Sequence, residues 1–212
     1  MIDNNTRLSA WALTAGSIIA TIGYLAASTM MHGGEHDRFT HSLWTPMSSI
    51  ALAGDLLMVL GLPAVLVAQQ QHARRLTLIG YVGLYATLVM LNIGEGVIET
   101  FVKPYLLHHG GIPDNPPGGF PIFEDVALVF LVVGLICLGV AVIRARQLPR
   151  WIGGLFIAAP ILGMIGLPGP LELLGDYCAY VALIAIGVLV LRRPPEIEKS
   201  STRRPPAQVV HH

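Results

Sequence analysis

Two acidic residues stand inside long apolar stretches of the sequence. Asp55 lies in the run 43–68, and Glu95 lies in the run 76–101. An ionisable group at the centre of a lipid bilayer costs about 3 kcal/mol or more, so it needs a partner or a cavity. A carboxyl group shielded from water can serve as a proton donor to a bound molecule. Asp55 and Glu95 are therefore the predicted catalytic residues, with a structural hydrogen-bonding role as the alternative.

Polar residues recur at helical spacing in two of the apolar runs. In the run 8–30, steps of three and four join Thr14, Ser17, Thr21, Tyr24 and Ser28. In the third run the same steps join Tyr81, Tyr85, Leu88, Asn92, Glu95 and Glu99. Such spacing places the side chains on one face of each helix. The first stripe is also typical of a helix-packing surface, because small and hydroxyl residues let helices approach closely.

We expect the polar faces of the first, second, third and sixth apolar helices to enclose a pocket that opens outward. The predicted ligand-binding residues are Thr21, Tyr24, Ser28, Asn92, Glu99, Asp176 and Tyr180. At about 1.5 Å per residue, Asp55 lies roughly 18 Å and Glu95 roughly 9 Å from the outer end of its run. Glu99 precedes Lys103 by one helical turn, which also predicts a surface ion pair between them.

The composition of the chain is that of a polytopic α-helical membrane protein. Of the 212 residues, 53% are hydrophobic and only 12% are charged, and the mean hydropathy is +0.64. The formal net charge of zero gives no electrostatic basis for binding nucleic acid. Six runs are long enough to cross a bilayer of about 30 Å. They are 8–30, 43–68, 76–101, 123–143, 151–167 and 171–191.

The basic residues predict the orientation of these six spans. If the spans alternate in direction, nearly all of the arginines fall on one side, which the positive-inside rule assigns to the cytoplasm. These are Arg7, Arg74, Arg75, Arg144, Arg146, Arg150, Arg192, Arg193, Arg203 and Arg204. The prediction is three outward-pointing hairpins in the plasma membrane, with both termini inside. It divides the chain into a transmembrane domain, 1–193, and a disordered cytoplasmic tail, 194–212.

Histidines gather in the two outer loops, where a metal site is one alternative and solvated side chains are the other. They are His32, His36, His41, His108 and His109. The string His32-Gly-Gly-Glu35-His36 matches the letters of an inverted zinc-protease motif, but two glycines disfavour the helix that this motif needs. The sequence therefore predicts solvated loop histidines, and neither a metal nor a cofactor. The loop 108–120, rich in glycine and proline, is predicted to be either a lid or a plain connector.

One resemblance follows from two motifs. The stretch from Arg146 to Gly154, Arg-Gln-Leu-Pro-Arg-Trp-Ile-Gly-Gly, and the stretch from Glu99 to Pro104, Glu-Thr-Phe-Val-Lys-Pro, resemble small multi-pass membrane proteins of actinobacterial type. The activity of that family is not known, so the resemblance implies the topology and no chemistry.

Three functions are compatible with these patterns. The leading hypothesis is a pocket that binds a lipid or another apolar small molecule, with acid–base isomerase or cyclase chemistry. The second is a proton- or cation-coupled transporter, which requires a polar route on the cytoplasmic side as well. The third is an accessory or sensory subunit whose fourth and fifth helices face a partner subunit or a second copy. The substrate is not encoded in any motif.

Overall fold

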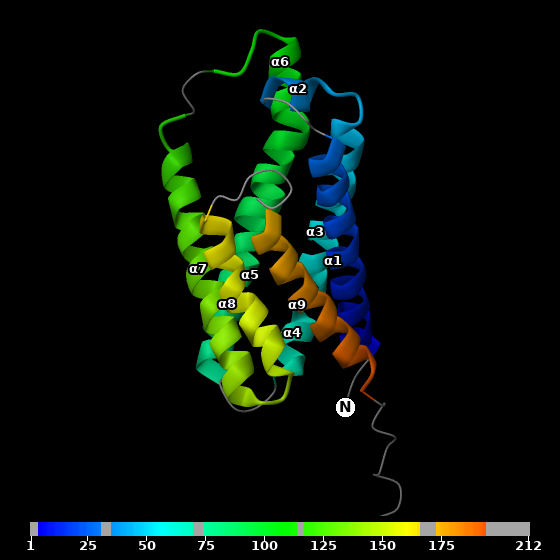
Figure 1. Ribbon diagram of the computed structural model, residues 1–212, viewed down its shortest axis with the longest axis vertical. Helices are drawn as coiled ribbons and strands as arrows, with labels where there is room; N and C mark the ends of the chain where they lie inside the picture. The colour runs from blue at the N-terminus through cyan, green and yellow to red at the C-terminus, as the bar shows by residue number, and fades with distance from the viewer. Residues whose placement is uncertain (1–3, 31–34, 70–73, 114–116, 166–172, 194–212) are drawn as a thin grey trace, which may run out of the picture.

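The computed structural model describes residues 4–30, 35–69, 74–113, 117–165 and 173–193, and their secondary structure is helical throughout, without a strand (Figure 1). The helices are α1 (Asn4–Met30), α2 (Glu35–Thr40), α3 (Trp44–Gly61), α4 (Pro63–Ala68), α5 (Arg74–Thr87), η1 (Leu88–Glu95), η2 (Ile98–Val102), α6 (Lys103–His108), α7 (Phe120–Ala145), α8 (Arg150–Met164) and α9 (Leu174–Leu191). The all-α prediction is confirmed. The predicted tail, 194–212, lies outside the described residues.

Five helices in the described part are long and apolar enough to cross a membrane. They are Asn4–Thr29, Trp44–Gly61, Arg75–His108, Phe120–Ala145 and Leu174–Leu191. The fifth predicted span, 151–167, corresponds to α8, which has 15 residues and falls short of that length. At a rise of 1.5 Å per residue, α8 is about 22 Å long, against a hydrocarbon layer of about 30 Å. Figure 1 shows that the upper ends of α8 and α9 lie well below the top of α7.

The second predicted span divides in two. The run 43–68 forms α3, which ends at Gly61, and α4, which begins at Pro63. Proline has no backbone N–H to donate to the preceding turn, so the α-helix is interrupted there. Both pieces remain apolar, and Leu62, Ala64 and Val65 are fully buried.

The third helix continues from Arg74 to His108, seven residues beyond the predicted end at Phe101. Its middle is π-helical, in η1 and η2, where the hydrogen bonds span five residues instead of four. A turn of π-helix holds more residues than a turn of α-helix, so side chains three and four positions apart move off a shared face. Short π-helical segments within α-helices are frequently found at functional sites.

Facing glycines bring four pairs of helices into backbone contact. A Cβ atom built on Gly54 of α3 would lie 2.8 Å from the Gly16 carbonyl oxygen of α1, and one on Gly175 of α9 would lie 2.9 Å from the Gly163 backbone nitrogen of α8. Gly83 of α5 and Gly134 of α7 meet in the same way. Small residues at such crossings let membrane helices approach to backbone contact. Gly139 of α7 and Gly153 of α8 also meet, so glycine contacts join α1 to α3, α5 to α7, α7 to α8 and α8 to α9.

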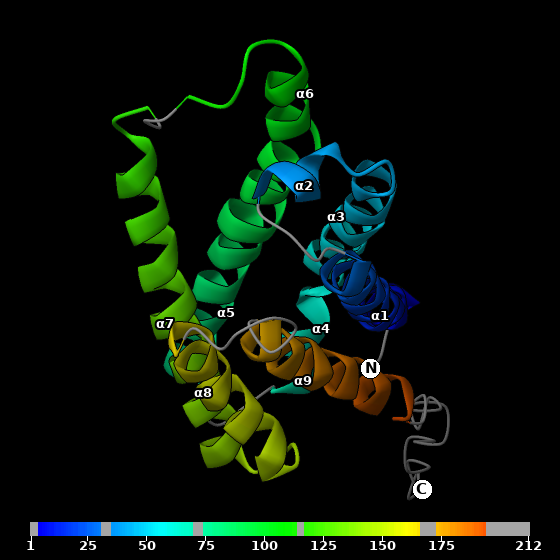
Figure 2. The same cartoon turned by 45° about the horizontal axis from the view of Figure 1, so that its top comes forward.

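The short helix α2 covers one end of the bundle, beside α6 and opposite the end where the chain begins (Figures 1 and 2). Phe39 of α2 meets the ring of Trp44 edge-on, with the ring centroids 5.2 Å apart. These two side chains and Ala27 are buried in a small apolar cluster, against which Leu107 and Ile112 pack. The main apolar core lies nearer the other end of the bundle. Polar side chains line the space between this core and the small apolar cluster.

Candidate functional site

Asp55 is completely buried at the contact of α1, α3 and α9. Its side chain has no exposed surface. The Tyr24 hydroxyl of α1 donates a hydrogen bond of 2.7 Å to Asp55 Oδ2, and the Tyr180 hydroxyl of α9 donates a longer one of 3.5 Å to Oδ1. Each carboxylate oxygen thus has a phenolic donor from a different helix, which offsets part of the cost of removing the group from water.

Asn92 extends this hydrogen-bonded group to the third membrane helix. Its Nδ2 atom donates to the Tyr180 hydroxyl oxygen at 2.8 Å. The Tyr24 and Tyr180 rings are stacked, with their centroids 6.3 Å apart and their planes 14° apart. The chain Asn92–Tyr180–Asp55–Tyr24 therefore joins four helices, the same four whose polar faces are predicted to meet.

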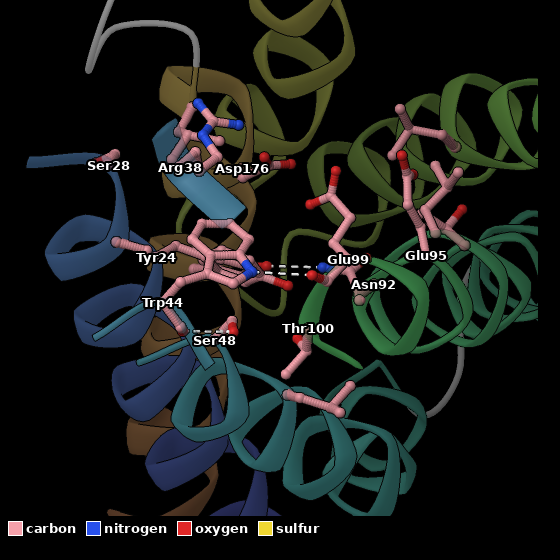
Figure 3. A pocket seen from close by; sticks show the side chains of 18 residues that line it. Tyr24, Ser28, Arg38, Trp44, Ser48, Asn92, Glu95, Glu99, Thr100 and Asp176 are labelled. Carbon is pink, nitrogen blue, oxygen red and sulfur yellow. Dashed lines mark hydrogen bonds between the residues drawn. The ribbon is translucent and has the colours of Figure 1, made fainter. Parts of the chain in front are cut away.

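A cavity of about 430 Å³ lies on the α2 side of this group (Figure 3). Its volume falls in the range of small-molecule sites, roughly 300–1,000 Å³. The wall is formed by Tyr24, Ala27, Ser28, Arg38, Trp44, Ser48, Leu52, Thr87, Leu91, Asn92, Glu95, Gly96, Glu99, Thr100, Leu131, Leu173, Asp176 and Tyr180. Asp55 is absent from the wall, because the two tyrosines stand between its carboxylate and the cavity. Any proton that Asp55 exchanges with a bound molecule passes through a tyrosine hydroxyl.

Three carboxylates reach the cavity from two helices. Glu95 of η1 and Glu99 of η2 come from the π-helical part of the third helix, and Asp176 comes from the first turn of α9. Glu99 forms the predicted ion pair with Lys103, at 3.2 Å. Because the helix continues to His108, Glu95 lies 13 residues from its end, about 20 Å at 1.5 Å per residue, and not the predicted 9 Å.

Trp44 fixes the wall of the cavity at the start of α3. Its indole Nε1 donates a 2.9 Å hydrogen bond to the backbone carbonyl oxygen of Glu99. That carbonyl belongs to π-helical backbone. The Arg38 guanidinium lies 5.8 Å from the centroid of the Trp44 ring on the other side, a cation–π distance. Trp44 therefore joins α2, α3 and η2 around the cavity.

The structure brings together six of the seven predicted ligand-binding residues. The exception is Thr21, whose hydroxyl donates to the Ser17 backbone carbonyl oxygen within α1. Thr14 and Ser17 make the same intrahelical bond and are buried in helix contacts. The lower part of the hydroxyl stripe is thus a packing surface, which was the alternative for this helix.

Only part of the predicted polar face of the third helix faces the cavity. Asn92, Glu95 and Glu99 line the cavity, but Tyr85 points outward with 45% of its surface exposed. The prediction that Tyr85 lies on the inner face is wrong, because the spacing assumed an α-helix and the helix is π-helical from Leu88.

The described histidines bond to nearby backbone. His108 Nδ1 lies 2.7 Å from the Pro104 carbonyl oxygen, and His109 Nδ1 lies 2.9 Å from that of Tyr105. Among the residues that the structure describes, no group of three His, Cys, Asp or Glu side chains is placed to hold a metal ion. His32 lies outside the described residues, as do the side chains of Glu35 and His36.

Comparison of the chain with protein-family models, with curated proteins and with solved structures found no match. The resemblance to small multi-pass bacterial membrane proteins therefore stays a prediction.

Several wall residues were not predicted, and one signal could have found two of them. Trp44, Ser48 and Asp55 are separated by four and seven residues, which places them on one face of α3. Arg38 and Thr100 carry no comparable signal. Arg38 lies on α2, a helix of six residues within a predicted loop, and Thr100 belongs to the π-helical segment η2.

Proposed function

We propose that this protein is a membrane-embedded binding protein whose cavity takes up a lipid or another small apolar molecule and carries out acid–base chemistry on it. The observation that supports this proposal most directly is the fully buried Asp55, hydrogen-bonded to a tyrosine that forms the wall of a 430 Å³ cavity. A carboxyl group at this depth is costly in a membrane, and ionisable residues in such positions usually serve a function.

The chemistry would be proton transfer between the Tyr24 hydroxyl and a bound molecule, with Asp55 as the group that exchanges a proton with Tyr24. The Tyr24 hydroxyl donates a hydrogen bond to Asp55 Oδ2, and Tyr24 lines the cavity. A proton on Asp55 would reverse this bond, so that the phenol could donate to a bound molecule. Isomerisation and cyclisation of unsaturated molecules need such a donor and acceptor. Glu95, on the opposite side of the cavity, is the second acid in the proposal.

The packing between Asp55 and the end of the bundle where α1 begins favours a pocket that opens on one side, and it disfavours a transporter. Toward the end of the bundle where α1 begins, the same helices contribute Leu13, Met58, Leu62 and Ile186, all fully buried. Thr14 and Ser17, the polar side chains at that level of α1, are engaged by their own helix. A coupling ion needs a polar route on both sides of its site, and the described residues offer one on the α2 side only.

For the placement in the cell, we propose the plasma membrane with both termini in the cytoplasm. The start of α1, the start of α5, the α7–α8 connection and the end of α9 lie at one end of the bundle (Figure 1). The basic residues Arg7, Arg75, Arg144, Arg146, Arg150, Arg192 and Arg193 belong to these segments. In this proposal α8 is a sixth membrane segment, which pairs with α9 and leaves the outer part of α7 to lipid.

Native mass spectrometry of the purified protein, loaded from a total lipid extract, tests the proposal. We expect a discrete bound small molecule in the wild type, and its loss or reduction in Asp55→Asn and in Glu95→Gln. Tyr85→Phe is the matched control, because that tyrosine is exposed and outside the cavity. No bound species in any form, or the same species at the same level in all four, would contradict the proposed function.

A further inference from the structure

A smaller, apolar cavity adjoins the first one. This cavity of about 60 Å³ lies between η1, α7, α8 and α9, and it shares Thr87, Asn92, Leu131, Asp176 and Tyr180 with the larger one. The rest of its wall is apolar or glycine, including Leu135 of α7, Ala159 of α8 and Ala179 of α9. The polar chamber and the apolar slot are therefore neighbours that share part of their wall, including Asp176 and Tyr180.

The slot lies beside the exposed end of α8. Gly163 lines the slot and is exposed, and the adjoining Met164 and Ile165 have 66% and 59% of their surface exposed. In a bilayer these surfaces meet hydrocarbon, so a chain lying in the slot can continue into the lipid.

The larger chamber is poor in free hydrogen-bond donors. Most donors in its wall bond within the protein: Tyr24 and Tyr180 to Asp55, Trp44 to Glu99, Ser48 to Trp44, and Thr87 to Gly83. Among the described wall residues, the donors left for a ligand are the Arg38 guanidinium, the Thr100 hydroxyl and the second N–H of Asn92.

Acceptors, in contrast, are free. The Glu95 and Asp176 carboxylates accept no hydrogen bond and form no ion pair with a described residue. The Tyr24 and Tyr180 hydroxyl groups donate their hydrogen bonds to Asp55, so toward the cavity their oxygens offer only lone pairs. Their rings add two π faces. The charged wall residues are Glu95, Glu99 and Asp176 against Arg38, so the acidic groups outnumber the basic one.

We propose that the ligand is a single-chain amphiphile with an amine head group, held by Glu95 and Asp176, with its first methylene groups in the slot between α7, α8 and α9. This inference rests on the proposed function and names its ligand class. An alkylammonium ion supplies donors and a positive charge to a wall that has free acceptors and negative charge. The tyrosine rings add a cation–π contribution. The slot selects a thin hydrocarbon chain next to the head group.

The test uses the full chain in phosphatidylcholine nanodiscs and three probes of equal chain length: dodecylamine, dodecanol and dodecanoate. Trp44 lines the cavity, whereas Trp11 and Trp151, which are the other two tryptophans of the chain, are 62% and 53% exposed. In a Trp11→Phe, Trp151→Phe background, the fluorescence of Trp44 reports on the cavity. We expect dodecylamine to give a saturable change at a concentration at least tenfold lower than dodecanol, and dodecanoate to bind most weakly.

The variants assign this preference to the cavity. Glu95→Gln with Asp176→Asn should lower the affinity for dodecylamine to that for dodecanol, and leave dodecanol unchanged. Asp125→Asn is the control, since this acid is exposed on α7 and lies outside the cavity. Ala179→Phe, which fills the slot, should weaken dodecylamine more than Val181→Phe, a substitution at an exposed position of the same helix.

The outcomes separate this inference from the proposed function. Equal or tighter binding of dodecanol or dodecanoate overturns the amine head group and leaves the binding cavity standing. A preference for dodecylamine that survives the removal of both carboxylates overturns their role. If no probe gives saturable binding, the single-chain amine ligand is overturned, whereas the proposed function fails only if the lipid-extract experiment also finds no bound species. Should the double variant not fold, the two single variants carry the same expectation, each with part of the loss.

Discussion

The Tyr24 hydroxyl of α1 donates a 2.7 Å hydrogen bond to Asp55 Oδ2 of α3, across a helix contact closed by Gly16 and Gly54. The short hydrogen bond and the close glycine contact both join α1 to α3. The glycines bring the helix backbones together, and the tyrosine then reaches an acid that water does not. Any change in the α1–α3 distance should therefore act on both stability and the buried acid.

Tyr24→Phe should destabilise the protein by about 1–2 kcal/mol, because it leaves one oxygen of a buried carboxyl group without its donor. Thermal unfolding in detergent, followed by circular dichroism, measures the change. Tyr85→Phe is the control and should unfold like the wild type, since its hydroxyl is in no hydrogen bond with a described residue and its ring is exposed. Equal unfolding of both variants would show that the bond between Tyr24 and Asp55 does not contribute to stability.

Gly54→Ala should separate α1 from α3. The added methyl carbon would lie 2.8 Å from the Gly16 carbonyl oxygen and closer still to the backbone of Ala20. Overpacking of this kind typically costs about 1–3 kcal/mol, since the helices must shift to admit the group. The same substitution at Gly154 of α8, where a Cβ meets nothing within 4 Å, should leave stability unchanged or raise it. Comparison of the two melting temperatures checks the prediction, and a drop for Gly154→Ala would contradict it.

The sequence contained enough information for the helices and for the meeting of their polar faces, because both depend on local periodicity. Tyr24, Asn92 and Tyr180 were recognised as polar positions in apolar runs, and the structure places all three around Asp55. What periodicity could not predict was the order of these groups in depth. Asp55 is separated from the cavity by the tyrosines, since their rings are large enough to cover it.

The remaining differences have physical causes that no local pattern expresses. The π-helical turns of the third helix changed which side chains share a face, so Tyr85 points outward and Thr100 inward. The contact between Trp44 and Glu99 joins residues 55 positions apart. The length of α8 could not be predicted from hydropathy, because the apolar sequence continues past the end of the helix.

Trp44→Phe should loosen the π-helical segment Ile98–Val102 while the bundle stays folded. The substitution removes the indole donor to the Glu99 carbonyl oxygen but keeps an aromatic ring against Phe39. The loss of one partly buried hydrogen bond is worth about 1 kcal/mol, enough to increase local opening severalfold. Hydrogen–deuterium exchange of peptides covering Ile98–Val102 should be faster in Trp44→Phe and unchanged in Trp151→Phe. Unchanged exchange in both variants would show that Trp44 does not stabilise this part of the cavity wall.

The proposed topology predicts a definite pattern of reporter fusions. Alkaline phosphatase is active only outside the cytoplasm, so it should be active when fused after Gly111, between α6 and α7. It should be inactive after Gln147, in the connection between α7 and α8, and after Arg193 at the end of α9. Green fluorescent protein at the same three positions should show the opposite pattern. Phosphatase activity after Gln147 would reverse the orientation assigned from the arginines.

A fusion after Leu173 decides the position of α8. With 15 residues, α8 is about 22 Å long, so it reaches the outer surface only if the bilayer thins there or if the residues that follow continue the crossing. If α8 is a membrane segment, phosphatase after Leu173 is exported and active, and α9 crosses back to the side of Arg193. Inactive phosphatase there, together with activity after Gly111, would mean that α8 and α9 enter the membrane from the cytoplasmic side without crossing it. The cavity would then be roofed by lipid above Asp176, and the amine head group would bind within the bilayer instead of at its outer surface.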